Sequence, residues 1–162
     1  METKIRVLYD SQCFDMQTHG GVSRCFVDLY KNLPDYVHGI LAVKETDNIY
    51  LREFGFDAKN HLYDSFVKKG EFPCKARLFD LVYNKILKYN YWPNFNRNYS
   101  VSVLRKNSFD IFHPTFFDPY FLQFLGKKPF VLTVHDMIPE LFPQYFGTNS
   151  SQTLNKKILF PL

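Results

Sequence analysis

The hydrophobic positions along the chain alternate between short apolar runs and stripes with helical spacing, which predicts alternating strands and helices. Apolar runs typical of buried strands cover Lys4–Asp10, His38–Val43, Asp110–Phe112 and Phe130–Val134. Helices are predicted over Gly21–Leu33, Asn48–Phe54, Cys74–Tyr89, Tyr99–Lys106 and Ser150–Leu162. This order predicts an α/β fold, with a Rossmann-like, mostly parallel sheet and helices on both faces.

The helix predicted over Gly21–Leu33 carries its apolar residues on one stripe, which is the face expected to turn toward the core. The stripe consists of Val22, Cys25, Phe26, Leu29 and Leu33. Pro34 follows at once, as is typical of the end of a helix. We therefore expect Cys25 to lie in the core.

His135 and Asp136 follow the run Phe130–Val134, where a strand buried on both faces should reach the rim of the sheet. Parallel α/β sheets bind ligands at the carboxyl ends of their strands, so a titratable pair there is a candidate site. A histidine exchanges protons or hydrogen bonds near neutral pH, and an adjacent carboxylate can orient its ring or bind a hydroxyl. The alternative is that the pair only caps the next turn.

The loop after the first strand leads to Gly20 and Gly21 at the start of a helix. Paired glycines let the backbone approach a ligand closely, and the amides and dipole of a helix N-terminus favour an anion such as phosphate. Arg24 would reinforce that preference. The alternative is that the glycines only make a tight turn into the helix.

The loop that begins at His113 is expected at the same edge of the sheet, because parallel strands end on one side. Two prolines stiffen this loop, His113 and Thr115 offer hydrogen bonds, and Phe116 offers an aromatic face for a sugar. The alternative is that the aromatic residues of the loop, Phe116, Phe117 and Tyr120, belong to the core.

Composition narrows the class of protein. The 162 residues suit one domain, and 46% hydrophobic with 22% charged residues indicates a folded chain. No stretch reaches the roughly 18 apolar residues of a membrane span, and no signal peptide is recognisable, so we expect a cytoplasmic protein. The cysteines Cys13, Cys25 and Cys74 match no disulfide or zinc spacing and are expected to be reduced. No pair of histidines has metal-ligand spacing.

The net charge of +4 is concentrated in residues 66–99, where seven basic residues outnumber two acidic ones. Basic and apolar residues alternate there and Tyr89, Tyr91 and Trp92 follow, which suits contact with the anionic inner face of a membrane or with a lipid-linked substrate. The alternative is an ordinary solvated helix face. Nucleic-acid binding is not expected, because no recognition module accompanies the charge.

Three segments occur in an order and spacing that is informative when they are taken together. They are Gly-Gly-Val-Ser-Arg at 20–24, Phe-His-Pro-Thr-Phe-Phe-Asp-Pro at 112–119 and Lys-Pro-Phe-Val-Leu-Thr-Val-His-Asp-Met-Ile at 128–138. In this combination the chain resembles the N-terminal, acceptor-side half of a GT-B type glycosyltransferase of family 4. The resemblance covers most of the chain and implies one Rossmann-like acceptor domain over residues 1–162.

The resemblance also implies an activity and roles for single residues. It implies transfer of a hexose from a nucleotide sugar to a saccharide or lipid-linked acceptor in cell-surface polysaccharide synthesis, with retained configuration, no metal and no cofactor besides the donor. His135 matches the histidine beside the transferred sugar, and Gly20 and Gly21 match the loop near the donor phosphates. The residues that match the acceptor-side wall are His113, Thr115, Phe116 and Asp136.

In that family, the helix corresponding to 150–162 leads into one more strand, a linker and a nucleotide-sugar-binding domain. The resemblance therefore implies that the acceptor domain is incomplete at its C-terminus and that uncovered surface would favour self-association. Two other functions stay open. One is a non-catalytic carbohydrate-binding or interaction module, and the other is a nucleotide-sugar epimerase of similar build.

Overall fold

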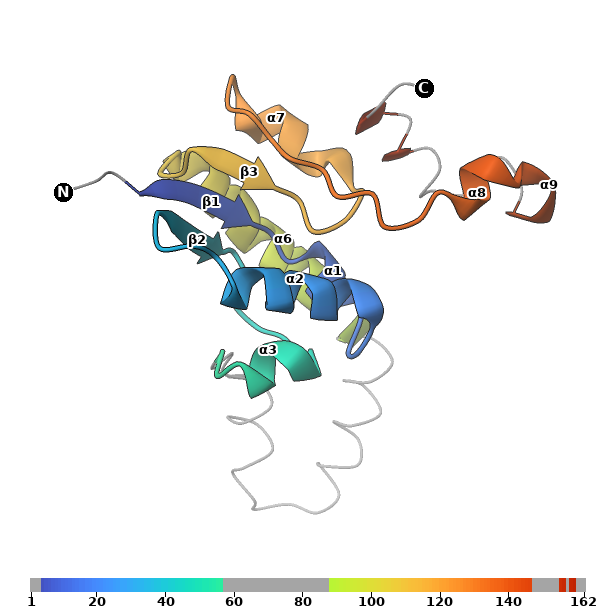
Figure 1. Ribbon diagram of the computed structural model, residues 1–162, viewed down its shortest axis with the longest axis horizontal. Helices are drawn as coiled ribbons and strands as arrows, with labels where there is room; N and C mark the ends of the chain where they lie inside the picture. Colours follow the sequence, from blue (N-terminus) through green and yellow to red (C-terminus); the bar gives the residue numbers. More distant parts are fainter. Residues whose placement is uncertain (1–3, 57–87, 147–154, 157, 160–162) are drawn as a thin grey trace, which may run out of the picture.

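A parallel three-stranded sheet lies at the centre of the fold (Figure 1). The computed structural model describes residues 4–56, 88–146, 155–156 and 158–159. The strands are β1 (Ile5–Tyr9), β2 (Val37–Leu41) and β3 (Ile111–His113), in the order β2-β1-β3. Every pairing is parallel, with Tyr9 opposite Leu41 on one side and His113 on the other.

Helices flank both faces of this sheet, and Figure 1 shows α2 in front of it and α6 behind it. The α-helices of the described residues are α1 (Gln12–Met16), α2 (Gly21–Lys31), α3 (Ile49–Glu53), α6 (Lys88–Lys106), α7 (Leu122–Leu125), α8 (Ile138–Leu141) and α9 (Pro143–Phe146). A 3-10 turn, η2 (Pro119–Phe121), precedes α7. The predicted α/β, Rossmann-like fold with a parallel sheet and helices on both faces is confirmed.

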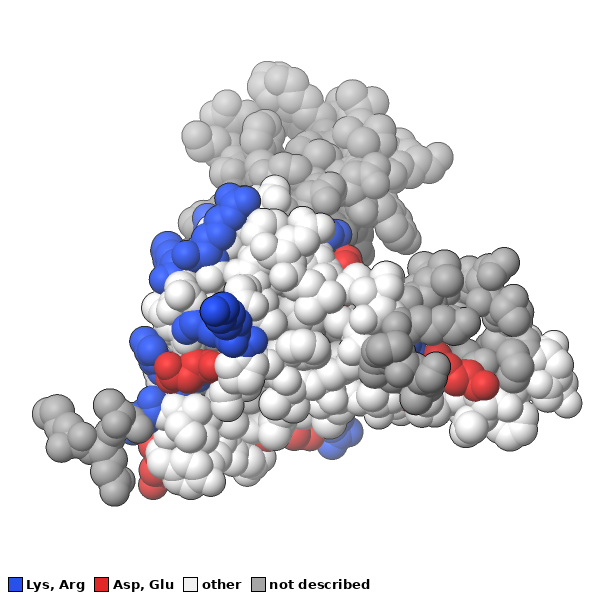
Figure 2. Space-filling model, turned by 90° about the horizontal axis from the view of Figure 1, so that it is seen from above, with Lys and Arg blue, Asp and Glu red and all other residues white. Residues whose placement is uncertain are grey.

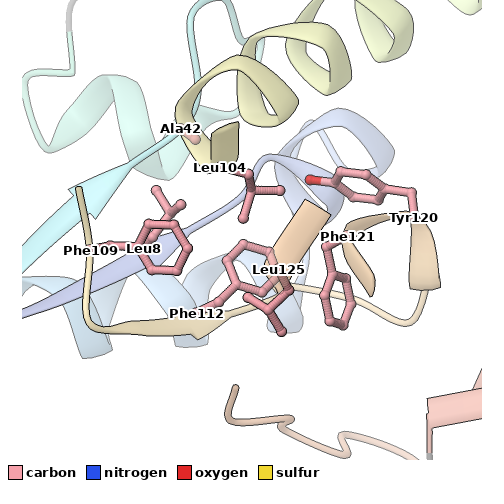
Figure 3. Close-up of a cluster of buried hydrophobic side chains, with 8 residues drawn as sticks. All are labelled: Leu8, Ala42, Leu104, Phe109, Phe112, Tyr120, Phe121 and Leu125. Atoms are coloured by element: carbon pink, nitrogen blue, oxygen red, sulfur yellow. The ribbon is translucent and has the colours of Figure 1, made fainter. Parts of the chain in front are cut away.

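The core has two parts because successive side chains of a strand point to opposite faces. Leu8 of β1 belongs to a cluster with side chains from α6, β3 and α7 (Figure 3). Its buried members are Leu8, Ala42, Leu104, Phe109, Phe112, Tyr120, Phe121 and Leu125. Tyr9, the next residue, belongs to a second cluster with Phe26 and Val27 of α2. The two clusters hold the helices on either side of the sheet.

The helix predicted over 21–33 is confirmed as α2, and Val22, Phe26 and Leu33 of the predicted apolar stripe are buried or packed against the second core cluster. Phe26 and Val27 are buried, whereas Cys25 and Leu29 are exposed. The placement of Cys25 in the core was wrong, because Ser23 rather than Cys25 turns inward and caps the Gly20 carbonyl. Cys13 is the buried free cysteine, in α1, and Cys74 lies outside the described residues.

The helix α6 extends further toward the N-terminus than the predicted Tyr99–Lys106. It begins at Lys88 and runs through an asparagine-rich stretch that contains Pro93, and the low helix propensity of these residues explains why the early part was missed. Most of the helix predicted over Cys74–Tyr89, and most of that predicted over Ser150–Leu162, lies outside the described residues.

The strand predicted over Phe130–Val134, buried on both faces, was wrong. Only one bridge joins it to the sheet, between Phe112 and Phe130, with the Val131 amide donating to the Phe112 carbonyl at 2.9 Å. Val131 and Val134 are 49% and 41% exposed. The pairing stops because β3 is three residues long and Pro114, which follows it, has no amide hydrogen for a longer ladder.

The described helices give no candidate for a membrane span, since none of them is both long and apolar enough. In the view of Figure 2, lysine and arginine side chains of the described residues gather along one side, and much of the remaining surface carries no charge. Most of the basic segment 66–99 lies outside the described residues, so its predicted contact with a membrane stays a prediction.

Candidate functional site at the carboxyl edge of the sheet

The strand order creates a crevice where β1 and β3 end side by side. The chain passes from β1 outward to β2 and then returns across β1 to β3. At such a switch point the loops that follow two neighbouring strands, here β1 and β3, diverge, and ligands of open α/β sheets bind there. The segments after Tyr9 and after His113 therefore build the candidate site.

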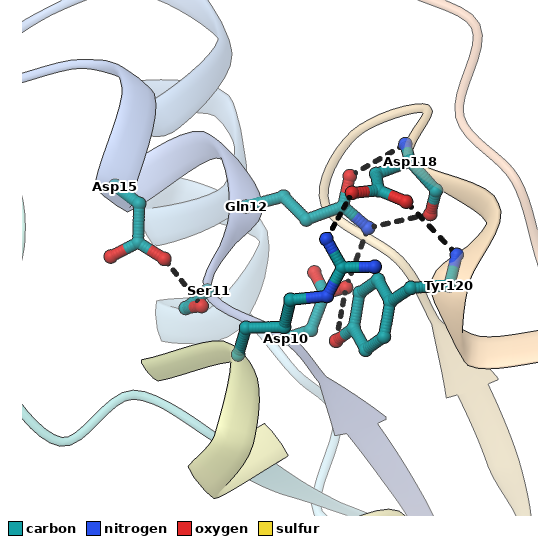
Figure 4. A network of polar contacts seen from close by, with 7 residues as sticks. Asp10, Ser11, Gln12, Asp15, Asp118 and Tyr120 are labelled. Carbon is teal, nitrogen blue, oxygen red and sulfur yellow. Dashed lines mark hydrogen bonds and ion pairs between the residues drawn. The ribbon is translucent and has the colours of Figure 1, made fainter. Parts of the chain in front are cut away.

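A buried carboxylate, Asp10, joins these two segments (Figure 4). Its Oδ1 accepts hydrogen bonds from the Thr115 amide and hydroxyl, each at 2.8 Å. Its Oδ2 accepts from Gln12 Nε2 at 2.7 Å and from the Tyr120 hydroxyl at 3.0 Å. Burial raises the pKa of Asp10, and the hydrogen bonds from Thr115, Gln12 and Tyr120 oppose that shift. Asp10 thus fixes the loop after β3 against the start of α1.

Gln12 makes a second connection between the same loops. Its Nε2 donates to the Asp118 carbonyl at 3.2 Å, and its Oε1 accepts from the Asp118 amide at 2.8 Å. The Asp118 carboxylate caps the turn at Tyr120 and pairs with Arg97 of α6 at 3.0 Å. The Arg97 guanidinium also lies over the Tyr120 ring, 4.8 Å from its centroid.

Asp15 of α1 is a second, separate carboxyl group at this edge. It accepts a hydrogen bond from the Ser11 hydroxyl at 2.6 Å and another from the side-chain amide of Asn96 in α6. Burial raises the pKa of Asp15 to about 7, against the opposing effect of these two hydrogen bonds. A carboxyl group with a pKa this close to neutrality can carry or release a proton under physiological conditions.

Asp15 lies in the lining of a cleft of about 250 Å³, which we call the Asp15 cleft. Gln12, Arg97, Asp118 and Tyr120 form part of its walls. The remaining lining residues are Ser11, Met16, Phe116, Phe117 and Asn155. The cleft therefore combines charged, amide and aromatic side chains at the switch point.

A pair of histidines lies at the same edge, on the α2 side of the sheet. The His113 ring packs between Tyr9 and Phe26, with centroid distances of 5.3 and 5.2 Å. Its Nε2 lies 2.8 Å from Thr133 Oγ1. Burial, with a smaller contribution from nearby His135, lowers the pKa of His113 to about 4, so the ring is neutral at pH 7.

His135 packs its ring edge-to-face on Phe26, at 5.5 Å between centroids. Burial lowers the pKa of His135 as well. Its Nε2 atom is buried and has no hydrogen-bond partner among the described residues. A buried polar atom without a partner is costly, so this nitrogen is a candidate contact for a ligand or an ordered water. His113, at the end of β3, and His135 therefore pack on the same Phe26 ring.

Asp136 has the role that the alternative interpretation assigned to it. Its Oδ1 accepts from the amide of Ile138, the first residue of α8, at 2.7 Å, and this bond closes the turn that leads into the helix. Its carbonyl accepts from the ammonium group of Lys156, which also pairs with Glu140 at 3.1 Å. The exposed Asp136 therefore stabilises a helix start, and its predicted part in acceptor binding stays a prediction.

The two glycines at the start of α2, Gly20 at its N-cap and Gly21 as its first residue, differ from each other. A Cβ on Gly20 would lie 2.3 Å from Oε1 of Gln17, whose side chain accepts a bond from the Ser23 amide at 3.3 Å. A Cβ on Gly21 would meet no atom within 4 Å, so the space in front of Gly21 is open. Arg24 is exposed and lies 3.7 Å from Asp28. Gln17 therefore occupies part of the helix N-terminus where phosphate binding was predicted.

Thr115 and Phe116 were both predicted to line the acceptor site, but only Phe116 lines the Asp15 cleft. Thr115 is buried, and its hydroxyl donates to Asp10 and accepts from the Cys13 amide at 3.1 Å. Its hydrogen bonds therefore hold the loop after β3 against α1. Phe116 is half-buried in the Asp15 cleft, 4.8 Å from the Phe117 ring. Phe117 and Tyr120 are buried, as the core interpretation predicted.

The sequence interpretation did not include Asp10, Asp15 or Arg97 among the site residues. A carboxylate at the end of the first predicted strand was the one available signal for Asp10. Nothing in the sequence indicated that α6 would bring Asn96 to Asp15 of α1 and Arg97 to Asp118, because these partners lie 81 and 21 residues away.

Within the described part of the chain, no group of three or more potential metal ligands is found. Comparison with protein-family models gives no match, and comparisons with curated proteins and with solved structures give none either.

Proposed function

We propose that the chain is the acceptor-side domain of a GT-B type, family 4 glycosyltransferase. In this proposal it transfers a hexose from a nucleotide sugar to a saccharide or lipid-linked acceptor of cell-surface polysaccharide synthesis, with retained configuration and without a metal. The donor nucleotide would be held by a second domain across the carboxyl edge of the sheet.

The observation that carries the proposal is the histidine pair at this edge. Both His113 and His135 have lowered pKa values, so both rings are neutral at pH 7. A neutral imidazole offers one donor and one acceptor nitrogen, which suits the hydroxyl groups of a sugar. The buried Nε2 of His135 has no partner among the described residues, so it can make such a contact without breaking an existing bond.

His113 acts in this proposal as a positioning residue for His135. Thr133 holds its Nε2, and the rings of Tyr9 and Phe26 hold its faces. His135 packs on the same Phe26 ring. A histidine whose orientation is fixed by packing and by its neighbours can align a substrate without paying the entropy of ordering at each turnover.

The start of α2 supports the proposal through Gly21 more than through Gly20. The space in front of Gly21 is open, which leaves room for a donor phosphate to approach the helix N-terminus. Gln17 fills the space beside Gly20, and Asp28 lies near the Arg24 guanidinium. In the proposed enzyme the main counter-charges for the leaving diphosphate would therefore come from the second domain.

A direct test is to express the full-length product of the gene that encodes this chain and to supply it with a panel of nucleotide hexoses. Release of nucleoside diphosphate that depends on an added saccharide or lipid-linked acceptor, with formation of a glycoside, is the expected result. Conversion of the nucleotide sugar to its epimer without an acceptor would replace the proposal with an epimerase. Glycan binding without consumption of any donor would replace it with a carbohydrate-binding module.

A further inference from the structure

We propose that the Asp15 cleft binds one uncharged sugar ring. The inference deepens the proposed function and rests on it only for the identification of this sugar as part of the acceptor. Binding itself requires no transfer reaction, so it can be tested on the 162-residue chain.

The size and lining of the cleft suit a single ring. At about 250 Å³ it is smaller than the pockets of roughly 300 Å³ and more that enclose drug-sized ligands, so it does not suit a whole nucleotide sugar. Phe116 is half-buried, with its ring tilted against Phe117, so it presents an aromatic wall for the apolar C–H face of a sugar. Asp15, Arg97 and Asn155 supply polar groups around it.

Some polar groups of the cleft use their hydrogen-bonding capacity within the protein, whereas others keep donors or acceptors for a ligand. Gln12 uses its amide on Asp10 and Asp118 and is part of the fixed framework. Asp15 accepts one bond on each oxygen, whereas an ionised carboxylate has about four acceptor sites. Arg97 uses one of its five N–H donors on Asp118. Asp15 and Arg97 can therefore bind sugar hydroxyls without losing these partners.

The charges in the lining favour a neutral ring over an acidic one. Arg97 is the cation among the lining residues, and its charge is balanced by Asp118 at 3.0 Å. Asp15 adds a carboxyl group, which is repulsive to a sugar phosphate or uronic acid when it is ionised. An ionised carboxylate forms stronger hydrogen bonds with neutral hydroxyls than an uncharged acceptor does.

The position of the cleft connects it with the histidine pair. His113, the last residue of β3, belongs to the pair, and Phe116 of the loop that follows β3 lines the cleft. Three residues of chain span at most about 11 Å, so the two places are close along this loop. A ring held in the cleft would put the next hydroxyl of a saccharide near the edge where His135 lies.

The test is a titration of the ¹⁵N-labelled chain with methyl glucoside, methyl galactoside and methyl mannoside, with glucuronate and glucose 1-phosphate as acidic counterparts. At least one neutral glycoside is expected to cause saturable chemical-shift changes in the segments 11–16 and 116–120. The acidic sugars should bind at least about threefold more weakly. Absence of saturable changes with every neutral glycoside, or equal binding of the acidic sugars, would overturn the inference.

Substitutions inside and outside the Asp15 cleft test where the glycoside binds. Phe116→Ala should weaken it about three- to tenfold, Phe116→Tyr should retain it, and Tyr36→Ala, at an exposed tyrosine, should leave it unchanged. Unchanged affinity in a folded Phe116→Ala chain, or equal loss in Tyr36→Ala, would contradict the assignment. His135→Ala should still bind the glycoside. Sugar transfer by the gene product without binding in the cleft would refute this inference alone and leave the proposed function standing.

Discussion

Oγ1 of Thr133 lies 2.8 Å from Nε2 of His113, across 20 residues of sequence. This hydrogen bond joins the end of β3 to the segment that carries His135. Together with the packing on Tyr9 and Phe26, it holds a neutral imidazole in an interior position. The stability of this edge of the sheet should therefore depend on pH.

The lowered pKa of His113 predicts a loss of stability in acid. Because the folded-state pKa is about 4 and the usual value is 6.5, the unfolded chain binds the proton first. The stability that comes from keeping His113 neutral is fully present above pH 6.5. As the pH falls toward 4, the free energy of unfolding should drop by about 2–3 kcal/mol. Urea unfolding of the parent and of His113→Gln, each at pH 7 and at pH 4, measures this loss of stability. An NMR titration that finds the His113 pKa at 6.5 or above would contradict the prediction.

Asp15 predicts a pH dependence of the opposite sign. Its folded-state pKa is about 7 against a usual 3.8, so the folded chain keeps a proton that the unfolded chain releases, and stability falls as the pH rises from about 4 to 7. Asp15→Asn keeps an oxygen that accepts from Asn96 and offers an amide NH₂ group to the Ser11 hydroxyl, but it cannot ionise. The variant should be more stable than the parent at pH 8, by on the order of 2 kcal/mol, and nearly equal to it at pH 4. An equal difference at both pH values would show that ionisation is not the cause.

Tyr120→Phe tests the buried link between the two loops. The variant removes the hydroxyl that donates to Asp10 at 3.0 Å and leaves the buried carboxylate with one donor fewer. The expected loss is about 1–3 kcal/mol in the free energy of unfolding, measured by urea denaturation. Tyr36→Phe, at a tyrosine 62% exposed, is the matched control and should be close to neutral. Equal stability of both variants would show that this bond contributes little.

The two glycines at the start of α2 should respond differently to alanine. Gly20→Ala forces the Gln17 side chain away and costs its bond to the Ser23 amide, a helix-start contact of about 0.5–2 kcal/mol. Gly21→Ala meets no atom and should be neutral or stabilising, because alanine favours the helix.

Thermal unfolding of both variants, in the parent and in a Gln17→Ala background, separates the causes. The cost of Gly20→Ala should largely disappear when Gln17 is already alanine. If the cost persists there, the strain lies in the backbone and not in the displaced side chain.

The sequence predicted the fold well where a local pattern decides the structure. The runs around Val7 and Ile40 and the amphipathic helix starting at Gly21 are local signals, and parallel pairing then follows from their alternation. The run Phe130–Val134 carries the same signal but forms one bridge, because its partner strand is cut short by Pro114. Whether an apolar run becomes a strand thus depends on its neighbour.

The candidate site was predictable in outline and not in detail. Parallel topology was enough to place His113, at the end of β3, at the edge where β1 ends, whereas His135 lies beside it although the strand predicted before His135 does not form. It was not enough to predict that Thr115 would turn inward to Asp10, 105 residues away. Nor could it identify the Asp15 cleft, because Asp15 and Asn96 are brought together only by the packing of α6 against α1.

The central claim is that His135 contacts the sugar during transfer, and one comparison of turnover tests it most directly. In the full-length gene product, with the active nucleotide sugar and acceptor, we predict that His135→Ala lowers kcat about 100-fold or more. The expected effect on the KM of the donor is small, because the second domain would hold the nucleotide. His38→Ala, at an exposed histidine of β2, should keep the parent rate. A His135→Ala enzyme that turns over as fast as the parent would contradict the claim.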